Sequence, residues 1–303
     1  MSPSVDPQAN GPERNEGPSS DRGPAYWVCA FFACVAFGAA GILLCYLIGE
    51  SLPALRSQGW PFLFGKDWFA GEKYGALPMI YGSAMATALA LALALPFALG
   101  GAVFVSEFLP SRARLIVKSI MELLAGAPGI IYGLLGMSLL APWIKNAFGL
   151  IDGNSLFAAG ALLGIMVLPT VMTLSEDALR SVPAEYRENA ISLGLTKTEV
   201  VFSVAVPQAL PGIAGAVFLG LGRAMGETIA VLLVIGGIDR IPSPWYDVFS
   251  PGQSIPSKLG REAAESLGYG LHWNALMGLG LVLLLMTMAV AFAGNLFLRR
   301  SRP

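Results

Sequence analysis

Apolar residues dominate six long stretches of the chain, which shorter polar segments separate. The six stretches run over residues 25–49, 77–105, 119–140, 155–173, 210–238 and 273–298. Each is close to or above the roughly 20 residues that an α-helix needs to cross the hydrocarbon core of a bilayer. The pattern therefore predicts an all-α membrane protein with six transmembrane helices.

The polar segments divide the chain further. Residues 1–24 contain five prolines among Ser, Asn, Gly and mixed charges, a composition typical of a disordered tail. Residues 50–76 combine aromatic side chains with scattered charge, and we expect an external hairpin on the membrane surface there. Residues 77–298 then form the main transmembrane domain, and residues 299–303 form a short second tail.

Composition supports a membrane protein and excludes other classes. Of 303 residues, 55% are hydrophobic and 13% are charged, against about 25% charged in soluble domains. The net charge of −1 gives no support for nucleic-acid binding. Cys29, Cys34 and Cys45 all fall within the first apolar stretch, where packing explains them and no disulfide or metal site is implied.

The distribution of Lys and Arg predicts the orientation in the membrane. If the amino terminus lies inside, the inner segments hold Arg14, Arg22, Arg112, Arg114, Lys118, Arg180, Arg187, Lys197, Arg299, Arg300 and Arg302. The outer segments hold Arg56, Lys66, Lys73, Lys145, Arg240, Lys258 and Arg261. Because cytoplasmic loops carry an excess of Lys and Arg near helix ends, we expect both termini and residues 181–207 in the cytoplasm.

Residues 181–207 form a polar interruption between two apolar stretches. Pro183 suits the start of a helix, and Gly194 suits the left-handed residue just after a helix end. Thr196 and Glu199 have the spacing of a capping box, in which each side chain satisfies the other's free backbone amide. The segment therefore predicts two short helices joined at a glycine, which we call the elbow.

The elbow resembles the EAA loop of ABC importer permeases. The matching residues are Glu188, Asn189, Ala190, Gly194, Val204, Val206 and Pro207, with Asn189, Val204 and Val206 as mild departures. The resemblance implies the type I ABC importer permease fold, with coupling helices that sit in a groove of a cytoplasmic ATPase. On this basis we assign a role in ATPase coupling to Glu185, Glu188, Ala190, Gly194 and Pro207.

Charged residues inside apolar stretches are the candidates for function. Arg223 lies near the middle of the fifth stretch, Glu227 follows four residues later, and Glu122 opens the third stretch. Four residues along a continuous helix bring two side chains to nearly the same face. Each charge costs roughly 2.5 to 3.5 kcal/mol to place at the centre of a membrane helix, so we expect these residues to face an interior or aqueous cavity.

Two interpretations of these charges stay open. One is a structural ion-pair network that fixes how the helices pack. The other is an anion path, because a guanidinium offers paired donors to a tetrahedral oxyanion. Phosphate at neutral pH keeps a hydroxyl that can donate to Glu227, whereas ionised sulfate would meet only repulsion there.

A second resemblance favours the anion path. The run from Gly222 to Val231 is similar to the signature of phosphate ABC permeases, and its Ala-Val ending favours the PstC type over the PstA type. Residues 74–83 and 121–133 are similar to the same family. The resemblance implies a substrate path through Arg223, Glu227, Thr228 and Glu122.

The resemblance also implies the partners: a PstA-type second permease, an ATPase dimer, and an external phosphate-binding protein. The sequence shows no phosphate loop, no metal-ligand cluster and no nucleophile with its base, and His272 stands alone. We therefore expect a prokaryotic inner-membrane transporter subunit that is not an enzyme and has no cofactor, with ATP bound by the partner ATPase. Alternatives are a permease for sulfate or molybdate, and a membrane scaffold that reports phosphate status to a sensor kinase.

Overall fold

The computed structural model describes residues 24–268 and 270–300, which are mostly helical. The predicted tail, apart from Pro24, and residues 301–303 lie outside the described residues. The α-helices are α1 (Pro24–Gln58), α2 (Pro61–Phe64), α3 (Leu77–Val103), α4 (Ser111–Ala125), α5 (Gly129–Leu135), α6 (Ala141–Phe148), α7 (Leu156–Arg180), α8 (Ala184–Ser192), α9 (Lys197–Val200), α10 (Val206–Gly226), α11 (Ile229–Val234), α12 (Ile255–Glu262) and α13 (Gly270–Arg300).

Three π-helical turns and two short strands complete these elements. The π-helical turns are η1 (Phe104–Phe108), η2 (Gly136–Leu140) and η3 (Val201–Ala205). The strands are β1 (Trp68–Phe69) and β2 (Lys73–Tyr74), which pair in antiparallel register with Trp68 opposite Tyr74. A β-hairpin thus lies within residues 50–76, and its external position on the membrane surface stays a prediction.

The chain divides into two units, residues 1–46 and residues 47–303. Helix α1 ends at Gln58, so the predicted end of the first helix at residue 49 is wrong. In this extension the Ser51 hydroxyl donates to the carbonyl of Ile48 at 2.9 Å. Asn274 donates to the carbonyl of Glu50 at 2.7 Å.

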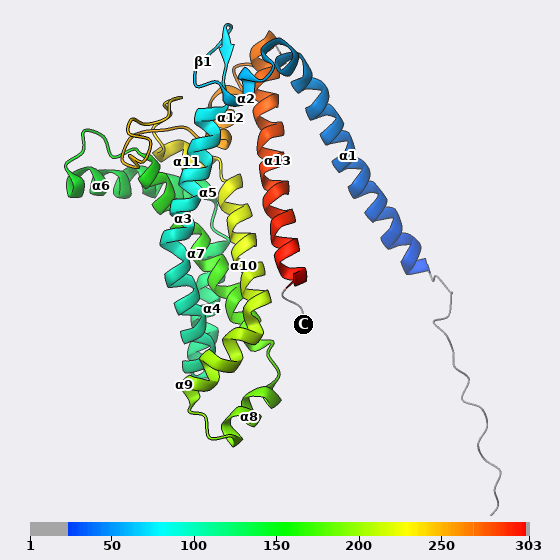
Figure 1. Cartoon of the computed structure of the whole chain (residues 1–303), viewed down its shortest axis with the longest axis vertical. Coiled ribbons are helices and arrows are strands. Elements are labelled where there is room, and N and C mark those ends of the chain that lie inside the picture. The colour runs from blue at the N-terminus through cyan, green and yellow to red at the C-terminus, as the bar shows by residue number, and fades with distance from the viewer. Residues whose placement is uncertain (1–23, 269, 301–303) are drawn as a thin grey trace, which may run out of the picture. The chain divides into compact units, whose positions relative to one another are not determined.

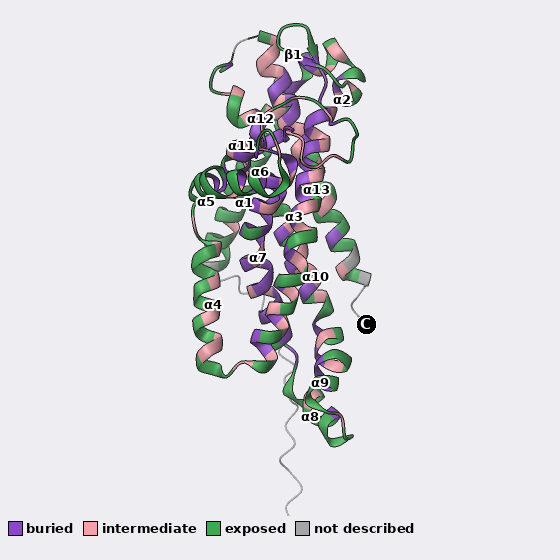
Figure 2. Cartoon of the chain, turned by 90° about the vertical axis from the view of Figure 1, so that its left-hand side faces the viewer, coloured by how far each residue is buried: buried purple, intermediate pink, exposed green. Residues whose placement is uncertain are grey.

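Helix α7 is the core of the second unit, with α3, α4 and α10 packed against it (Figure 1). Helix α3 meets α7 along a stripe of alanines four residues apart, all buried: Ala86, Ala90, Ala94, Ala98 and Ala102. Gly160 and Gly164 of α7 face this stripe, and a Cβ atom on Gly160 would lie 2.5 Å from the Cβ atom of Leu89. Small residues at this spacing let the two backbones approach closely. Figure 2 shows the buried residues concentrated along α7.

Two of the predicted transmembrane helices are broken. Helix α4 and the helical segment Gly129–Phe148 meet at an angle of 88°, so residues 119–140 do not form one straight helix. Pro128 lies at this break, where its missing N–H ends the helical ladder. The second break follows Gly226, where α10 ends before α11 begins at Ile229. Residues 210–238 are therefore also not a single helix.

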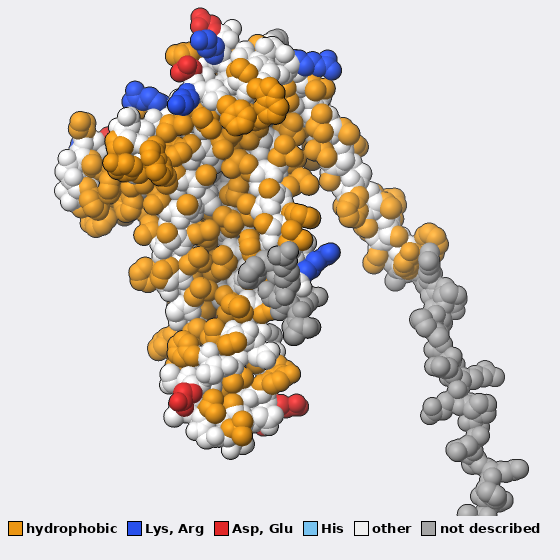
Figure 3. Space-filling view, viewed as in Figure 1, with side chains coloured by type: hydrophobic (Ala, Val, Ile, Leu, Met, Phe, Trp, Pro, Cys, Tyr) orange, Lys and Arg blue, Asp and Glu red, His pale blue; other side chains and the backbone are white. Residues whose placement is uncertain are grey.

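Length and composition identify the membrane-spanning segments. Five described helical stretches are long and apolar enough to cross a bilayer, and there are six if the bent pair Ser111–Ala125 and Gly129–Phe148 is one span. Figure 3 shows hydrophobic side chains over most of the visible face of α3, α10 and α13. The chain is a multi-pass membrane protein.

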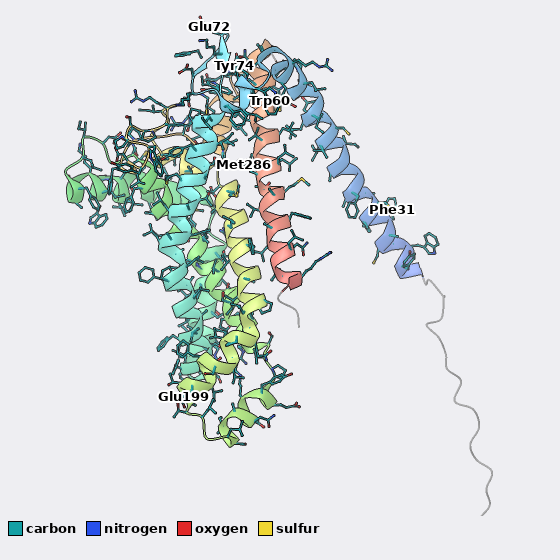
Figure 4. The ribbon with its side chains drawn as sticks, viewed as in Figure 1. Phe31, Trp60, Glu72, Tyr74, Glu199 and Met286 are labelled. Atoms are coloured by element: carbon teal, nitrogen blue, oxygen red, sulfur yellow. The ribbon has the colours of Figure 1, made fainter. Side chains whose placement is uncertain are left out.

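The elbow has the local structure that the sequence predicts. Helix α8 follows Pro183, Gly194 has a φ of +90°, and α9 begins with a capping box between Thr196 and Glu199. Figure 4 labels Glu199 at the elbow, and Tyr74 and Glu72 of the β-hairpin at the opposite end of the second unit. The elbow and the hairpin are thus at the two ends of the α3, α7 and α10 helices.

Candidate functional site at two broken helices

Arg223 joins the two helix breaks. It lies in the last turn of α10, and its Nη2 atom donates to the carbonyl of Ala125, 2.6 Å away at the end of α4. Its Nη1 atom donates to the Thr170 hydroxyl of α7 at 2.9 Å. The last carbonyls of a helix have no partner within that helix, so the guanidinium satisfies one that the break exposes.

Glu227 lies just beyond the end of α10, in extended backbone conformation. Its Oε1 atom accepts from the backbone N–H of Ala230 at 3.2 Å, at the start of α11. Gly129, the first residue of α5, lies against the carboxylate: a Cβ atom there would be 2.5 Å from Oε1. The carboxylate therefore occupies the space left by a glycine and is held by the N-terminal turn of α11.

The expected arrangement of these two residues on one helix face is wrong. Helix α10 ends at Gly226, so Arg223 and Glu227 do not share a continuous helix. The ion pairs among the described residues do not include a pair between them. The simple structural interpretation, in which each charge neutralises the other directly, has no support in this geometry.

The other two residues predicted for the substrate path, Glu122 and Thr228, lie on other elements than Arg223. Glu122 lies on α4, which has no buried residue in this chain, and its side chain is exposed. This chain leaves Glu122 uncovered, so its place facing an interior or an aqueous cavity stays a prediction. Thr228 directly precedes α11, and its methyl group lies against Gly260 of α12.

A narrow pocket opens beside Glu227. Its polar lining residues include Ser83 and Thr87 of α3 and Ser254, while Met225 and Val231 contribute apolar surface. The Ser83 hydroxyl accepts from the backbone N–H of Ile255 at 2.9 Å. Helix α3 therefore forms one wall of the space next to the carboxylate, and the α10–α11 break forms another.

The guanidinium has the chemistry to bind an oxyanion. Two of its five N–H groups make the bonds to Ala125 and Thr170, and the other three have no partner among the described residues. These donors are paired in a plane, which matches the oxygens of a tetrahedral anion. Thr170 and the Ala125 carbonyl were not found from the sequence, although Pro128 near one of them signals the break.

The residues assigned to coupling lie together at the elbow. Glu185 and Glu188 are exposed on α8, whereas Ala190 is 6% exposed. Gly194 joins the two short helices, and Pro207 is the second residue of α10. The described residues contain no cluster of His, Cys, Asp and Glu that could hold a metal ion.

Comparison with known families decides the class of protein. The profile described as "Binding-protein-dependent transport system inner membrane component" matches residues 94–303. The chain belongs to this family. The match covers more than half of the chain, so the predicted membership of the ABC importer permeases is confirmed.

Curated relatives extend over most of the chain. The "Phosphate transport system permease protein PstC" of Mesorhizobium japonicum is 34% identical over 290 residues, covering 86% of this chain and 88% of the relative. The protein of the same name from Pasteurella multocida is 35% identical, covering 89% of both chains. "Probable ABC transporter permease protein YqgH" of Bacillus subtilis is 36% identical over 230 residues, covering 75% of this chain and 73% of the relative.

Solved structures support the fold. An inward-facing form of the MetNI methionine ABC transporter aligns with a TM-score of 0.56 and 18% identity, covering 76% of this chain and 95% of that chain. A bacterial alginate ABC transporter aligns with a TM-score of 0.61 and 15% identity, covering 91% and 94%. At these identities the likeness concerns the fold, which is that of ABC importer permeases of type I.

Proposed function

We propose that the chain is the PstC-type permease subunit of an ATP-driven importer of inorganic phosphate. The observation that carries the proposal is the Arg223 guanidinium, which lies at the junction of two broken helices with three donors free of described partners. The phosphate permeases among its relatives support the choice of anion.

Selectivity for phosphate follows from the carboxylate beside the junction. Glu227 would repel a fully ionised anion, but phosphate at neutral pH keeps at least one hydroxyl that can donate to an acceptor. A site that places a buried acceptor opposite that hydroxyl rejects an anion without the proton, because its acceptor is then left unpaired. Glu227 therefore favours phosphate over sulfate in this proposal.

Transport requires partners that this chain does not supply. We expect a PstA-type permease to complete the pore, an ATPase dimer to dock at the elbow, and a phosphate-binding protein to deliver the substrate outside. Glu185, Glu188, Ala190, Gly194 and Pro207 are the residues that we place at the ATPase contact, and Glu122 and Thr228 belong to the substrate path. No cofactor is proposed.

The proposed orientation places both termini and the elbow in the cytoplasm. Exposed Ser192 on α8 is a suitable reporter once Cys29, Cys34 and Cys45 are replaced by serine. A Ser192→Cys variant in intact cells should resist a membrane-impermeant thiol reagent and react after the membrane is opened. Labelling from outside would contradict the proposed ATPase contact.

Uptake measurements test the function directly. Vesicles that contain the complex, the binding protein and internal ATP should accumulate labelled phosphate, with little competition from sulfate or molybdate. Uptake of sulfate in preference to phosphate would identify a different oxyanion permease. Co-purification with the partners but no uptake of any of these anions would favour a signalling scaffold.

A further inference from the structure

The carboxyl-terminal end of α3 is held in place by an arginine. Helix α3 continues into the π-helical turn η1 and stops at Leu109, before Pro110. Arg114, in the first turn of α4, donates through Nε to the Val105 carbonyl at 3.1 Å. Its Nη2 atom donates to the carbonyls of Ser106 at 3.0 Å and Leu109 at 3.2 Å. These bonds satisfy carbonyls that the helix end leaves free, so η1 has a fixed shape.

Glu107 projects from η1 toward the elbow. Its side chain is 9% exposed, and its carboxylate accepts a charge-assisted hydrogen bond from Nη1 of Arg187 on α8. The Nη2 atom of the same arginine donates to the carbonyl of Leu179 in the last turn of α7, at 2.8 Å. A single guanidinium therefore connects α8 with the ends of α3 and α7.

Helix α8 has few other connections to the rest of the chain. Ala190 is its one buried residue, whereas Tyr186 and Ile191 are more than half exposed. Among the hydrogen bonds and ion pairs of the described residues, Arg187 is the α8 residue whose side chain reaches beyond the elbow. The attachment of α8 to α3 thus depends on this arginine.

Helix α3 connects this attachment to the pocket beside Glu227. Its alanine stripe packs on α7 through Gly160 and Gly164, and its other end supplies Ser83 and Thr87 to the pocket wall. The elbow therefore connects to the candidate site through three elements. The chain runs from the elbow through α9 and η3 into α10 and Arg223, α7 carries Thr170 to Arg223, and α3 reaches the pocket wall.

We propose that the Arg187–Glu107 ion pair is the joint through which movement of α8 is passed to α3, so that both walls of the site move together. The proposal rests on the proposed function, because it assigns the two residues to coupling in an ATP-driven importer. Both are positioning residues. Because the pair is largely shielded from water, removal of one partner leaves the other charge buried and unpaired.

The attachment can be tested without any transport partner. Spin labels at Ser192→Cys on α8 and Phe97→Cys on α3 report the distance between the two helices by double electron–electron resonance. Both positions are exposed, and serine replaces the three native cysteines. In lipid nanodiscs the otherwise unaltered chain should give one narrow distance distribution.

Loss of the joint should release α8 from α3. We expect Arg187→Ala and Glu107→Ala each to broaden the distance distribution, and the double variant to be no broader than Arg187→Ala, which also loses the bond to Leu179. Glu107→Gln keeps an acceptor oxygen for Arg187 and should broaden it less. Arg112→Ala removes an exposed arginine of α4 and serves as the matched control. Narrow distributions in the alanine variants, or a double variant clearly broader than both single variants, would overturn the proposal.

Coupling is the second readout. In the reconstituted complex, each single variant should lower the phosphate transported per ATP hydrolysed by about tenfold, and the double variant by the same factor, as for residues that act as a unit. Co-purification of the ATPase shows that the variants still fold and assemble. If the unaltered complex moves no phosphate, the proposed function fails, while the spin-label result still decides whether the joint exists. Full coupling in the variants would refute the joint alone.

Discussion

Arg223 of α10 donates a hydrogen bond to the carbonyl of Ala125, the last residue of α4, across a distance of 2.6 Å. A charged side chain near the end of one broken helix thus satisfies a backbone group at the end of another. Such irregular backbone is tolerated at membrane depth where it lies inside protein or lines an aqueous cavity. This hydrogen bond links the two breaks and gives the arginine a fixed position beside the proposed substrate path.

Changes at Arg223 and Thr170 test the geometry of the guanidinium. Arg223→Lys keeps the charge but loses the planar fork, so phosphate uptake should fall by about tenfold or more. Thr170→Val removes the hydroxyl that accepts from Arg223 at nearly constant side-chain volume. Phosphate uptake should fall by about fivefold. Thr173→Val is the control, because the Thr173 hydroxyl bonds within α7. Equal uptake in the Thr170 and Thr173 variants would show that the hydrogen bond to Arg223 is not needed.

The position of the Glu227 carboxylate can be changed without altering its charge. In Gly129→Ala, the new Cβ atom would lie 2.5 Å from Oε1, so the carboxylate has to move, which a flexible side chain does without unfolding the protein. Phosphate uptake should fall while the unfolding temperature changes little. In Gly126→Ala the nearest atom would be the Glu122 carbonyl oxygen at 3.5 Å, an ordinary contact. Normal uptake in both variants would show that the carboxylate position does not matter.

The charge of Glu227 is tested by Glu227→Gln. The amide keeps the shape and an acceptor for the Ala230 N–H, so the complex should assemble. Selectivity for phosphate over arsenate should stay unchanged, since arsenate keeps the same proton, while selectivity over sulfate should weaken. Uptake of the three labelled anions in vesicles is the measurement. Sulfate that remains fully excluded by the variant would remove the proposed role of Glu227.

The elbow was predictable from the sequence because its determinants are local. Gly194 supplies a positive φ, and Thr196 and Glu199 cap the next helix by bonds three residues apart. No prediction was drawn from the stripe of alanines on α3, although its members stand four residues apart in the sequence. Its packing on α7 depends on Gly160 and Gly164, and nothing in the sequence pairs the two helices.

The sequence predicts Arg223 and Glu227 as candidate residues, but it predicts neither their geometry nor the contact of Arg223 with Thr170. The apolar run over residues 210–238 predicts one helix through Glu227. The pattern of apolar residues alone does not show where a helix ends inside such a run. The break depends on tertiary contacts: Arg223 reaches α4, and Glu227 caps α11 against Gly129. For the same reason the exposure of Glu122 could not be read from the sequence.

Lys258 stabilises the end of the second unit opposite the elbow. Its side chain is 3% exposed and forms ion pairs with Asp239 and Glu262, with its ammonium 5.2 Å from the centre of the Trp68 ring. Lys258→Met leaves Asp239 without its cationic partner and leaves Glu262 with His272 alone. We expect the free energy of unfolding to fall by about 3 kcal/mol near neutral pH, in line with other buried pairs that lose one member.

The loss of stability in Lys258→Met should depend on pH. Burial raises the pKa of Asp239, while its hydrogen bond to Lys258 lowers it, so the pKa should rise further in Lys258→Met. The folded-state pKa of Asp239 lies above its unfolded value of about 3.9. The free energy of unfolding therefore falls as the pH rises from the unfolded to the folded pKa. The variant should therefore recover stability at acidic pH relative to the unaltered chain. Unfolding in detergent at several pH values, with exposed Lys145→Met as control, measures this. A pH-independent difference would contradict the account.

Substitution of Gly194 isolates the backbone geometry of the elbow from packing. A Cβ atom at this position would have no neighbour within 4 Å, so the cost comes from the φ of +90° alone. Alanine should cost roughly 1 to 2 kcal/mol at such a φ, and β-branched valine more. Gly194→Ala should therefore weaken the ATPase activity that the loaded phosphate-binding protein stimulates, and Gly194→Val should abolish it, while assembly in the membrane survives.

Gly215→Val is the matched control for the elbow, because a Cβ atom there also has no neighbour within 4 Å while the residue lies inside α10. It should reduce stimulation little, since valine adopts a helical φ with only a small loss of side-chain freedom. The measurement is ATP hydrolysis by the purified complex with and without the loaded binding protein. Normal stimulation in Gly194→Val would show that the glycine geometry is not needed for coupling, whereas equal loss in both valine variants would indicate a general effect of added bulk.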